Sequence, residues 1–223
     1  PLLGSVAGVV WNDLDGNGTR GAVEPGISGW TVYLDANGNS LLDASERSAM
    51  TDANGEYRFE GVSYGTLTIR EVVPADWLAI QPATASRSFR LLNSENRSAV
   101  DFGVRERIGT IQGTVRNDAD GDRVVDAGET GLADWTVFLD LDGDSTQDPA
   151  EPSTITDSSG AYRFTRVPVG VYRVVEVMQD GWISSLGTSS ATSVSVVIGG
   201  THTVDFQSLQ PVLGTLSGTV FSD

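Results

Sequence analysis

The chain has 223 residues, of which 39% are hydrophobic and another 26 are glycine, so it can bury one or two cores of ordinary size. Its net charge of −16 excludes strong binding to nucleic acid or anionic lipid, because its 14 basic residues, all of them arginine, are spread along the chain. With no cysteine, no lysine and His202 as its only histidine, it has almost no residues for thiol, zinc or Ser-His-Asp chemistry, so we expect no enzymatic activity.

Short apolar and β-branched runs, separated by Gly, Asn, Asp and Pro, predict strands throughout the chain. In the first half we expect strands at 5–11, 29–34, 56–60, 66–73, 87–92 and 98–104. The pair Asn54-Gly55 predicts a hairpin turn, because Gly accepts the positive φ that such turns require. No apolar run approaches the roughly 20 residues of a membrane span. About seven strands in about 100 residues predict an all-β fold, an immunoglobulin-like or prealbumin-like β-sandwich.

The sequence repeats at an interval of 105 residues. The segment GSVAGVVWND, which ends at Asp13, returns as GTIQGTVRND, which ends at Asp118, and again as GTLSGTVFSD, which ends at Asp223. Such internal similarity predicts tandem copies of one domain. The expected domains are a first repeat at 1–104, a second repeat at 105–208 and the first strand of a truncated third repeat at 209–223.

Four acidic loops of twelve residues interrupt the expected strands, two in each repeat: 13–24, 35–46, 118–129 and 140–151. Each has Asp at position 1, Asp or Asn at positions 3 and 5, and Glu at position 12. Calcium takes six to eight oxygen ligands, and a loop of this spacing supplies them from positions 1, 3, 5, 9 and 12 and from the backbone carbonyl of position 7. Magnesium fits so flexible a cage less well. The expected ligands are Asp13, Asp15, Asn17, Thr19 and Glu24; Asp35, Asn37, Asn39, Leu41, Asp43 and Glu46; Asp118, Asp120, Asp122, Val124, Asp126 and Glu129; and Asp140, Asp142, Asp144, Thr146, Asp148 and Glu151.

The alternative interpretation is that these residues only form turns, since Asp, Asn and Gly are common in turns. It suits Asp52 and its counterpart Asp157, although either could instead join a metal site. It does not explain a Glu at position 12 of all four loops. We therefore expect calcium in at least one loop of each repeat, bound more tightly in the second repeat, whose loops carry five carboxylates each instead of three.

The loops depart from an EF-hand in three ways. Strands flank them instead of helices, and position 9 of the first loop is Gly21, which has no side chain to offer. The Gly usual at position 6 is present only as Gly18, and the other loops have Ser40, Arg123 and Ser145 there.

The order Gly-x-Val-x-x-Asp-x-Asp-Gly-Asn, Glu-Pro-Gly-Ile-x-Gly-x-Thr-Val-x-Leu and Thr-Asp-x-Asn-Gly-x-Tyr-x-Phe resembles the SdrD B-like domains of serine-aspartate repeat surface proteins, within the wider Cna B-type group. The resemblance covers nearly the whole chain, twice. It implies a prealbumin-like sandwich that binds calcium and is strung in tandem. Carried over from the family, the calcium motif falls on Asp13, Asp15, Asn17 and Glu24, and on Asp118, Asp120, Asp122, Asp126 and Glu129. Many Cna B-type domains are locked by a Lys–Asn isopeptide bond, which a chain without lysine cannot form, so calcium would be its main source of rigidity.

The predicted function is a calcium-stabilised stalk or spacer module of a repetitive bacterial protein, secreted or on the cell surface, of the adhesin type. Its expected partners are calcium, neighbouring repeats and, through other domains, a host or matrix ligand; we expect a monomer that neither binds nucleic acid nor inserts into a membrane. The alternative is a calcium-dependent ligand- or carbohydrate-binding adhesin module in which Trp77 or Trp182 contacts the sugar. Trp30 and Trp135 are expected to fill the two cores.

Overall fold

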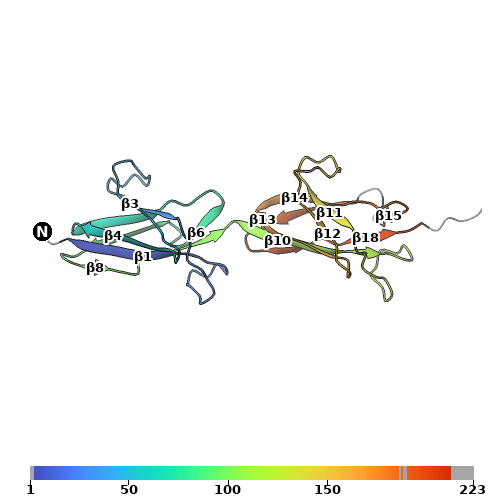
Figure 1. The fold of residues 1–223 in the computed structure, drawn as a ribbon, viewed down its shortest axis with the longest axis horizontal. Helices are drawn as coiled ribbons and strands as arrows, with labels where there is room; N and C mark the ends of the chain where they lie inside the picture. Colours follow the sequence, from blue (N-terminus) through green and yellow to red (C-terminus); the bar gives the residue numbers. More distant parts are fainter. Residues whose placement is uncertain (1–2, 186, 188–189, 212–223) are drawn as a thin grey trace, which may run out of the picture. The chain divides into compact units, whose positions relative to one another are not determined.

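The computed structural model describes residues 3–185, 187 and 190–211, and every regular element in these ranges is a β-strand. No helix among these residues is long and apolar enough to cross a membrane. The chain divides into two compact units between Arg107 and Ile108 (Figure 1). Of the segment expected to start a third repeat, 209–223, residues 212–223 lie outside the described residues. Its first residue, Leu209, is instead the last residue of a strand of the second unit.

The first unit contains two sheets. One sheet has the order β4–β1–β9–β6, with β8 also paired to β1. Its strands are β1 (Gly4–Asn12), β4 (Glu56–Val62), β6 (Trp77–Gln81), β8 (Asn96–Arg97) and β9 (Phe102–Glu106). The other sheet has the order β3–β2–β5–β7. Its strands are β2 (Thr31–Leu34), β3 (Ser48–Met50), β5 (Gly65–Glu71) and β7 (Ser86–Leu91).

The second unit repeats this topology. Its first sheet has the order β13–β10–β18–β15, with β17 also paired to β10, and its second sheet has the order β12–β11–β14–β16. The strands of the first sheet are β10 (Ile108–Asn117), β13 (Ala161–Pro168), β15 (Ile183–Ser184), β17 (Thr201–Thr203) and β18 (Phe206–Leu209). Those of the second are β11 (Thr136–Asp140), β12 (Ser153–Ile155), β14 (Gly170–Glu176) and β16 (Ala191–Val196).

Each sandwich has its own hydrophobic core, built by alternating residues of the facing strands. In β13, for example, Tyr162 and Phe164 are buried while Arg163 between them is exposed. The buried cluster of the first unit includes Val10, and that of the second includes Val115, each near the end of the strand that leads into an acidic loop. Burial of these strands therefore fixes the point from which the loop starts.

The expected core tryptophans are buried, which confirms their assignment. Trp30 is 6% exposed and Trp135 is 2% exposed. Trp77 and Trp182 are half-buried and pack edge-on against them, with ring centroids 5.1 and 5.4 Å apart.

The turn at Asn54-Gly55 is present, but the expectation that it forms a hairpin is wrong. Gly55 has a φ of +79° and its N–H donates to the carbonyl of Asp52 at 3.0 Å. The strands on either side, β3 and β4, belong to different sheets, so the turn carries the chain across the sandwich. The turn chemistry is the same in both arrangements, and only the tertiary pairing of the strands distinguishes them.

Candidate metal sites

The four acidic loops all begin where a strand ends. Loops 13–24, 35–46 and 118–129 follow the last residues of β1, β2 and β10, and loop 140–151 begins on the last residue of β11. The Asp at position 1 is therefore anchored in the sandwich and buried, with exposed fractions of 0, 7, 0 and 5% in chain order. In each unit the two loops project on different sides of the sandwich (Figure 1).

The backbone of each loop folds around the carboxylates of positions 1 and 12. In loop 13–24 the carboxylate of Asp13 accepts the N–H groups of Gly16 and Gly18 at 2.7 and 2.8 Å, and that of Glu24 accepts those of Leu14 and Gly21 at 2.8 Å each. The other three loops have the same four bonds, from positions 4 and 6 to position 1 and from positions 2 and 9 to position 12. A simple turn does not require these hydrogen bonds between its two ends.

The missing glycines at position 6 do not change the loop backbone. Gly18 has a φ of +76°, and Ser40, Arg123 and Ser145 have φ values between 66° and 69° at the same position. A residue with a side chain is strained in this left-handed region by about 1 kcal/mol or more. The bonds to positions 1 and 12 offset that strain, so the loop geometry survives the substitution.

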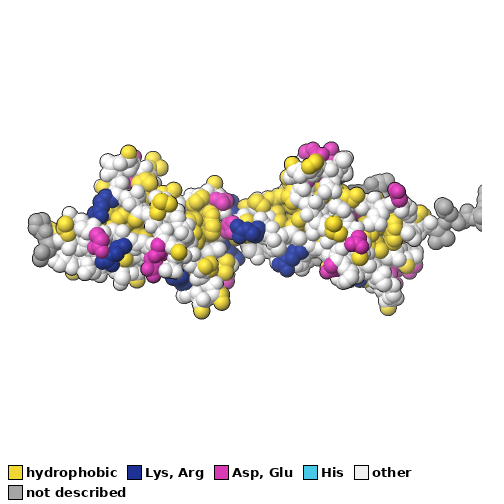
Figure 2. Space-filling view, viewed as in Figure 1, with side chains coloured by type: hydrophobic (Ala, Val, Ile, Leu, Met, Phe, Trp, Pro, Cys, Tyr) yellow, Lys and Arg dark blue, Asp and Glu magenta, His cyan; other side chains and the backbone are white. Residues whose placement is uncertain are grey.

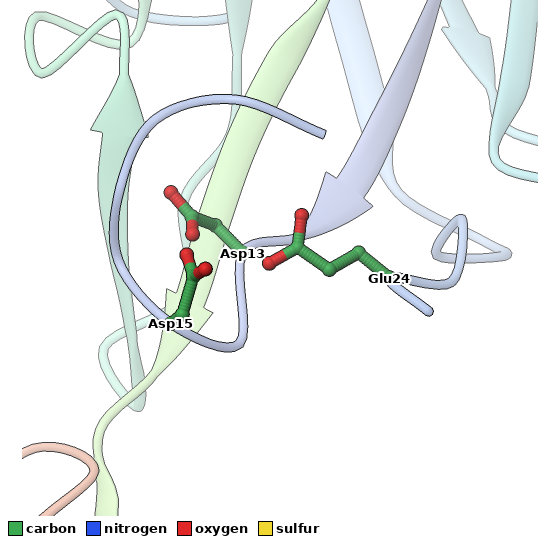
Figure 3. A group of neighbouring side chains, drawn as sticks. All are labelled: Asp13, Asp15 and Glu24. Atoms are coloured by element: carbon green, nitrogen blue, oxygen red, sulfur yellow. The ribbon is translucent and has the colours of Figure 1, made fainter. Parts of the chain in front are cut away.

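Three loops bring carboxylate groups close enough to share an ion. Asp13, Asp15 and Glu24 each offer one oxygen within 4.8 Å of the others, and Glu24 reaches toward the two aspartates from the returning end of the loop (Figure 3). Loops 118–129 and 140–151 each contain two such overlapping groups. These are Asp118, Asp120 and Glu129; Asp120, Asp122 and Asp126; Asp140, Asp142 and Glu151; and Asp142, Asp144 and Asp148. Their donors are all oxygen atoms, which suits a hard divalent cation.

Loop 35–46 differs from the other three, because the described residues contain no such carboxylate group there. The amides of Asn37 and Asn39 instead donate to the carboxylate of Asp43 at 2.7 and 2.8 Å. The expected ligands of this loop are thus connected to one another by hydrogen bonds.

The negative charge of loop 140–151 acts on its own residues. Partial desolvation, together with the carboxylates of Asp142, Asp144 and Glu151, raises the pKa of Asp148 above its ordinary value. Figure 2 shows acidic side chains gathered on this projecting loop after β11. The carboxylates of this loop therefore repel one another, and a bound cation would reduce that repulsion.

Two arginines that the sequence analysis missed contact position 1 of the second loop in each unit. Arg70 on β5 donates to Asp35 at 2.6 Å, and Arg173 on β14 lies 3.0 Å from Asp140. Burial raises the pKa of Asp35, but the bonds from Arg70 and from the N–H groups of Gly38 and Ser40 lower it more, so the net pKa is below its ordinary value. Arg70 and Arg173 are 103 positions apart, whereas the aspartates are 105 apart, so aligning the repeats does not match them.

The position 7 residues, Thr19, Leu41, Val124 and Thr146, donate their N–H groups to the side chain of position 5. A role for their carbonyl oxygens as ligands stays a prediction. Asp52 and Asp157 accept N–H groups of their own turns, and bonds from the hydroxyl and N–H of Ser159 and the N–H of Ala161 lower the pKa of Asp157. The turn role therefore accounts for both residues.

Two buried glutamates were also missed. Glu71 on β5 and Glu176 on β14 are 5% and 1% exposed, and one carboxylate oxygen of each has no hydrogen-bond partner. Burial raises the pKa of Glu71 to about 8 and that of Glu176 to about 7. Their spacing of 105 residues, which equals the repeat interval, is the sequence signal that could have found them.

The fold and its loops define a pair of tandem β-sandwich repeat domains with acidic groups that could hold metal ions. The SdrD B-like domain family matches residues 4–102 and 109–207, and the chain belongs to this family. It is a family of non-enzymatic repeat domains found in surface proteins of the adhesin type, so the chain is a bacterial cell-surface module.

Curated relatives are much longer than this chain. It is 25% identical over 189 residues to the serine-aspartate repeat-containing protein D of Staphylococcus aureus strain Newman, which covers 81% of the chain and 14% of the relative. It is 32% identical over 190 residues to protein C of strain N315, which covers 74% of the chain and 18% of the relative.

Solved structures of pilins are also similar. The shaft pilin SpaA of Lactobacillus rhamnosus GG covers 94% of this chain and is itself fully covered, with 11% identity and a TM-score of 0.48. The minor pilin GBS52 of Streptococcus agalactiae covers 97% and is fully covered, with 16% identity and a TM-score of 0.39.

Proposed function

We propose that the chain is a pair of calcium-stabilised spacer domains of a longer adhesin-type protein on the bacterial surface. The ions are held by the acidic loops and make each sandwich rigid. The chain acts as a monomer, and ligand recognition belongs to other domains of the whole protein.

The observation that carries this proposal is the arrangement of carboxylates in loops 13–24, 118–129 and 140–151. Each loop presents at least three carboxylate oxygens within 4.8 Å of one another, while backbone N–H groups already hold the carboxylates of positions 1 and 12. Such oxygens repel one another unless a cation lies between them. The proposed ligands are Asp13, Asp15 and Glu24; Asp118, Asp120, Asp122, Asp126 and Glu129; and Asp140, Asp142, Asp144, Asp148 and Glu151.

Calcium fits these donors better than magnesium does. It accepts six to eight oxygens at flexible angles, whereas magnesium demands a near-ideal octahedron and gives up its water reluctantly. Extracellular modules bind calcium with dissociation constants of roughly 0.1–1 mM. Such sites would be filled outside the cell and largely empty in the cytosol.

Binding only to the folded state stabilises it by about 2.7 kcal/mol per site at one hundred times the dissociation constant. The chain should therefore melt about 10 °C or more higher in excess calcium than in EGTA, with magnesium giving much less. Circular dichroism measures the melt, and light scattering of the same samples tests the monomer. Melting temperatures that do not respond to calcium would overturn the proposal.

A matched pair of variants locates the effect. Asp120→Asn with Asp142→Asn, one substitution in each loop of the second unit, should remove much of the calcium response. The control, Asp76→Asn with Asp180→Asn, changes the net charge by the same amount at exposed positions outside the loops. It should leave the response of the melting temperature to calcium intact. Equal loss in both variants would assign the response to net charge instead of to the loops.

The alternative of a carbohydrate-binding module gains no support from its candidate residues. Trp77 and Trp182 pack edge-on against the core tryptophans, which occupies ring surface that a sugar would need. The spacer role therefore fits the tryptophans better.

A further inference from the structure

Loops 35–46 and 140–151 hold corresponding places in the two units but have different interiors. Each follows an inner strand of the corresponding sheet of its unit, β2 in the first and β11 in the second, and both have Asp at position 1, Asp at position 9 and Glu at position 12. Positions 3 and 5 are Asn37 and Asn39 in the first unit, and Asp142 and Asp144 in the second. The two loops therefore differ in charge at positions 3 and 5.

In loop 35–46 the side-chain amides of positions 3 and 5 donate hydrogen bonds to the carboxylate of position 9. The side-chain oxygen of Asn37 accepts the N–H of Asn39 at 3.0 Å, and that of Asn39 accepts the N–H of Leu41 at 2.8 Å. These bonds turn both NH₂ groups toward the loop interior, where each donates to the same carboxylate oxygen of Asp43. The oxygen that would otherwise face a metal ion is therefore already bonded to two positively polarised hydrogens.

A guanidinium from outside the loop completes this closure. Arg70, on the neighbouring strand β5, donates to Asp35 at 2.6 Å, and the side chain of Asp35 is fully buried. Charge-assisted bonds of this kind are roughly twice as strong as neutral ones. Positions 1 and 9 of the loop are thus satisfied by groups of the protein.

Loop 140–151 has the same arginine contact but not the amides. Arg173 lies 3.0 Å from Asp140 and also bonds the carbonyl of Gly143 and the hydroxyl of Ser145. In its interior, Asp142, Asp144 and Asp148 bring three carboxylates within 4.8 Å of one another, and positions 3 and 5 have carboxylates where loop 35–46 has amides. Figure 2 shows acidic side chains on the surface of this loop, whereas the surface of loop 35–46 in its own unit is largely uncharged.

We propose that loop 35–46 is closed by its own Asn37 and Asn39 amides and by Arg70, so that it keeps its shape without calcium, and that the residues at positions 3 and 5 decide which loops depend on the ion. This inference rests on the proposed calcium binding of the other loops. It assigns to Asn37 and Asn39 a specificity-determining role and removes loop 35–46 from the set of calcium-dependent loops.

The first test counts ions per full chain by equilibrium dialysis against millimolar calcium and metal analysis. Asn37→Asp with Asn39→Asp should raise the count by one ion, and Asp142→Asn with Asp144→Asn should lower it. The control Thr84→Asp with Asn93→Asp adds the same two charges at exposed positions and should leave the count unchanged. An unchanged count in the Asn37→Asp/Asn39→Asp chain overturns the inference, whereas a parent chain that binds no calcium overturns the proposed function instead.

The second test measures amide hydrogen exchange of the parent chain in EGTA. Residues of loop 35–46 should exchange about tenfold more slowly than those of loop 140–151, because local opening of a closed loop costs free energy. Arg70→Met should remove that protection, while Arg90→Met on the neighbouring strand β7 should not. Equal exchange of the two loops in the parent chain, or protection that survives Arg70→Met, would contradict the role of the arginine and the amides.

Discussion

Glu71 and Glu176 are acids whose side chains are buried in the two sandwiches. The indole N–H of Trp30 donates to Glu71 at 3.0 Å, and the hydroxyl of Ser208 donates to Glu176 at 2.6 Å. Burial outweighs these bonds and raises the pKa values to about 8 and about 7. The folded state thus holds protons at these sites at a pH where the unfolded chain has released them.

This difference makes the stability of the calcium-free chain depend on pH. A raised pKa in the folded state stabilises it fully below the unfolded pKa, and the effect is lost as the pH rises through the folded pKa. The free energy of unfolding in EGTA should therefore fall between about pH 4.5 and pH 8 for Glu71, and between about pH 4.5 and pH 7 for Glu176, by about 1.4 kcal/mol per pH unit for each group. Urea unfolding at a series of pH values measures it.

The variant Glu71→Gln with Glu176→Gln should flatten this slope, because a neutral amide does not titrate. Glu60→Gln, at an exposed position on β4, is the control and should keep the parent slope. Three parallel pH curves would show that these two glutamates do not titrate in the range.

At the scale of single residues, the sequence predicted that carboxylates come together in loops 13–24, 118–129 and 140–151, because metal-ligand spacing is a local pattern, and their role as ligands stays a prediction. The residues at positions 1 and 12 of this spacing are also the ones whose carboxylates accept the backbone N–H groups of the loop. The arginines were not predictable in the same way. Arg70 and Arg173 reach their aspartates from a neighbouring strand, and they stand at different places in the repeat, so only the pairing of β5 with β2 and of β14 with β11 reveals the contact.

At the scale of elements, the predicted strands 5–11, 29–34, 56–60, 66–73, 87–92 and 98–104 correspond to β1, β2, β4, β5, β7 and β9. The sequence did not predict β3, β6 and β8. Both β3 and β6 lie at the edge of a sheet and β8 has two residues, so none of them carries a long alternating pattern. Strands of this kind form because a neighbour supplies their hydrogen bonds, and a local pattern does not report that.

The return of the first loop to the sandwich depends on close packing of backbone against backbone. Gly26 bridges to Trp11 of β1 and lies under the turn 52–55, where an added Cβ would come within 1.7 Å of the carbonyl of Asn54. Gly26→Ala should therefore cost about 1–3 kcal/mol of stability in the first unit. Gly21→Ala is the matched control, since its Cβ would meet nothing closer than 3.8 Å.

Denaturant unfolding in EGTA measures this cost as a change in midpoint at constant slope. The absence of calcium separates packing from metal binding, because Gly21 lies inside a proposed metal loop. If Gly26→Ala and Gly21→Ala both unfold at the midpoint of the parent, the backbone of turn 52–55 does not pack against Gly26 as closely as this contact requires.

At the scale of the whole molecule, two units of one topology differ in the charge of their loops. The loops of the first unit have three carboxylates each and those of the second have five. The first unit has in addition the amide-closed loop 35–46. The same fold is therefore combined with two levels of electrostatic repulsion, and the second unit has more to gain from a cation.

This asymmetry predicts that the units respond unequally to calcium removal. In EGTA the second unit should open more often than the first, and its β10 to β18 amides should exchange faster, because the five carboxylates within each of its loops repel one another by about 1 kcal/mol per pair at 4 Å even in water. Hydrogen exchange of the full chain, followed by peptide mapping, resolves the two units in one sample.

Raising the salt to about 1 M shortens the screening length to about 3 Å and should narrow the difference in exchange rate between the two units. If the first unit opened more often, or if salt left the gap unchanged, repulsion between carboxylates would not be the cause, and differences in core packing between the two sandwiches would have to explain it.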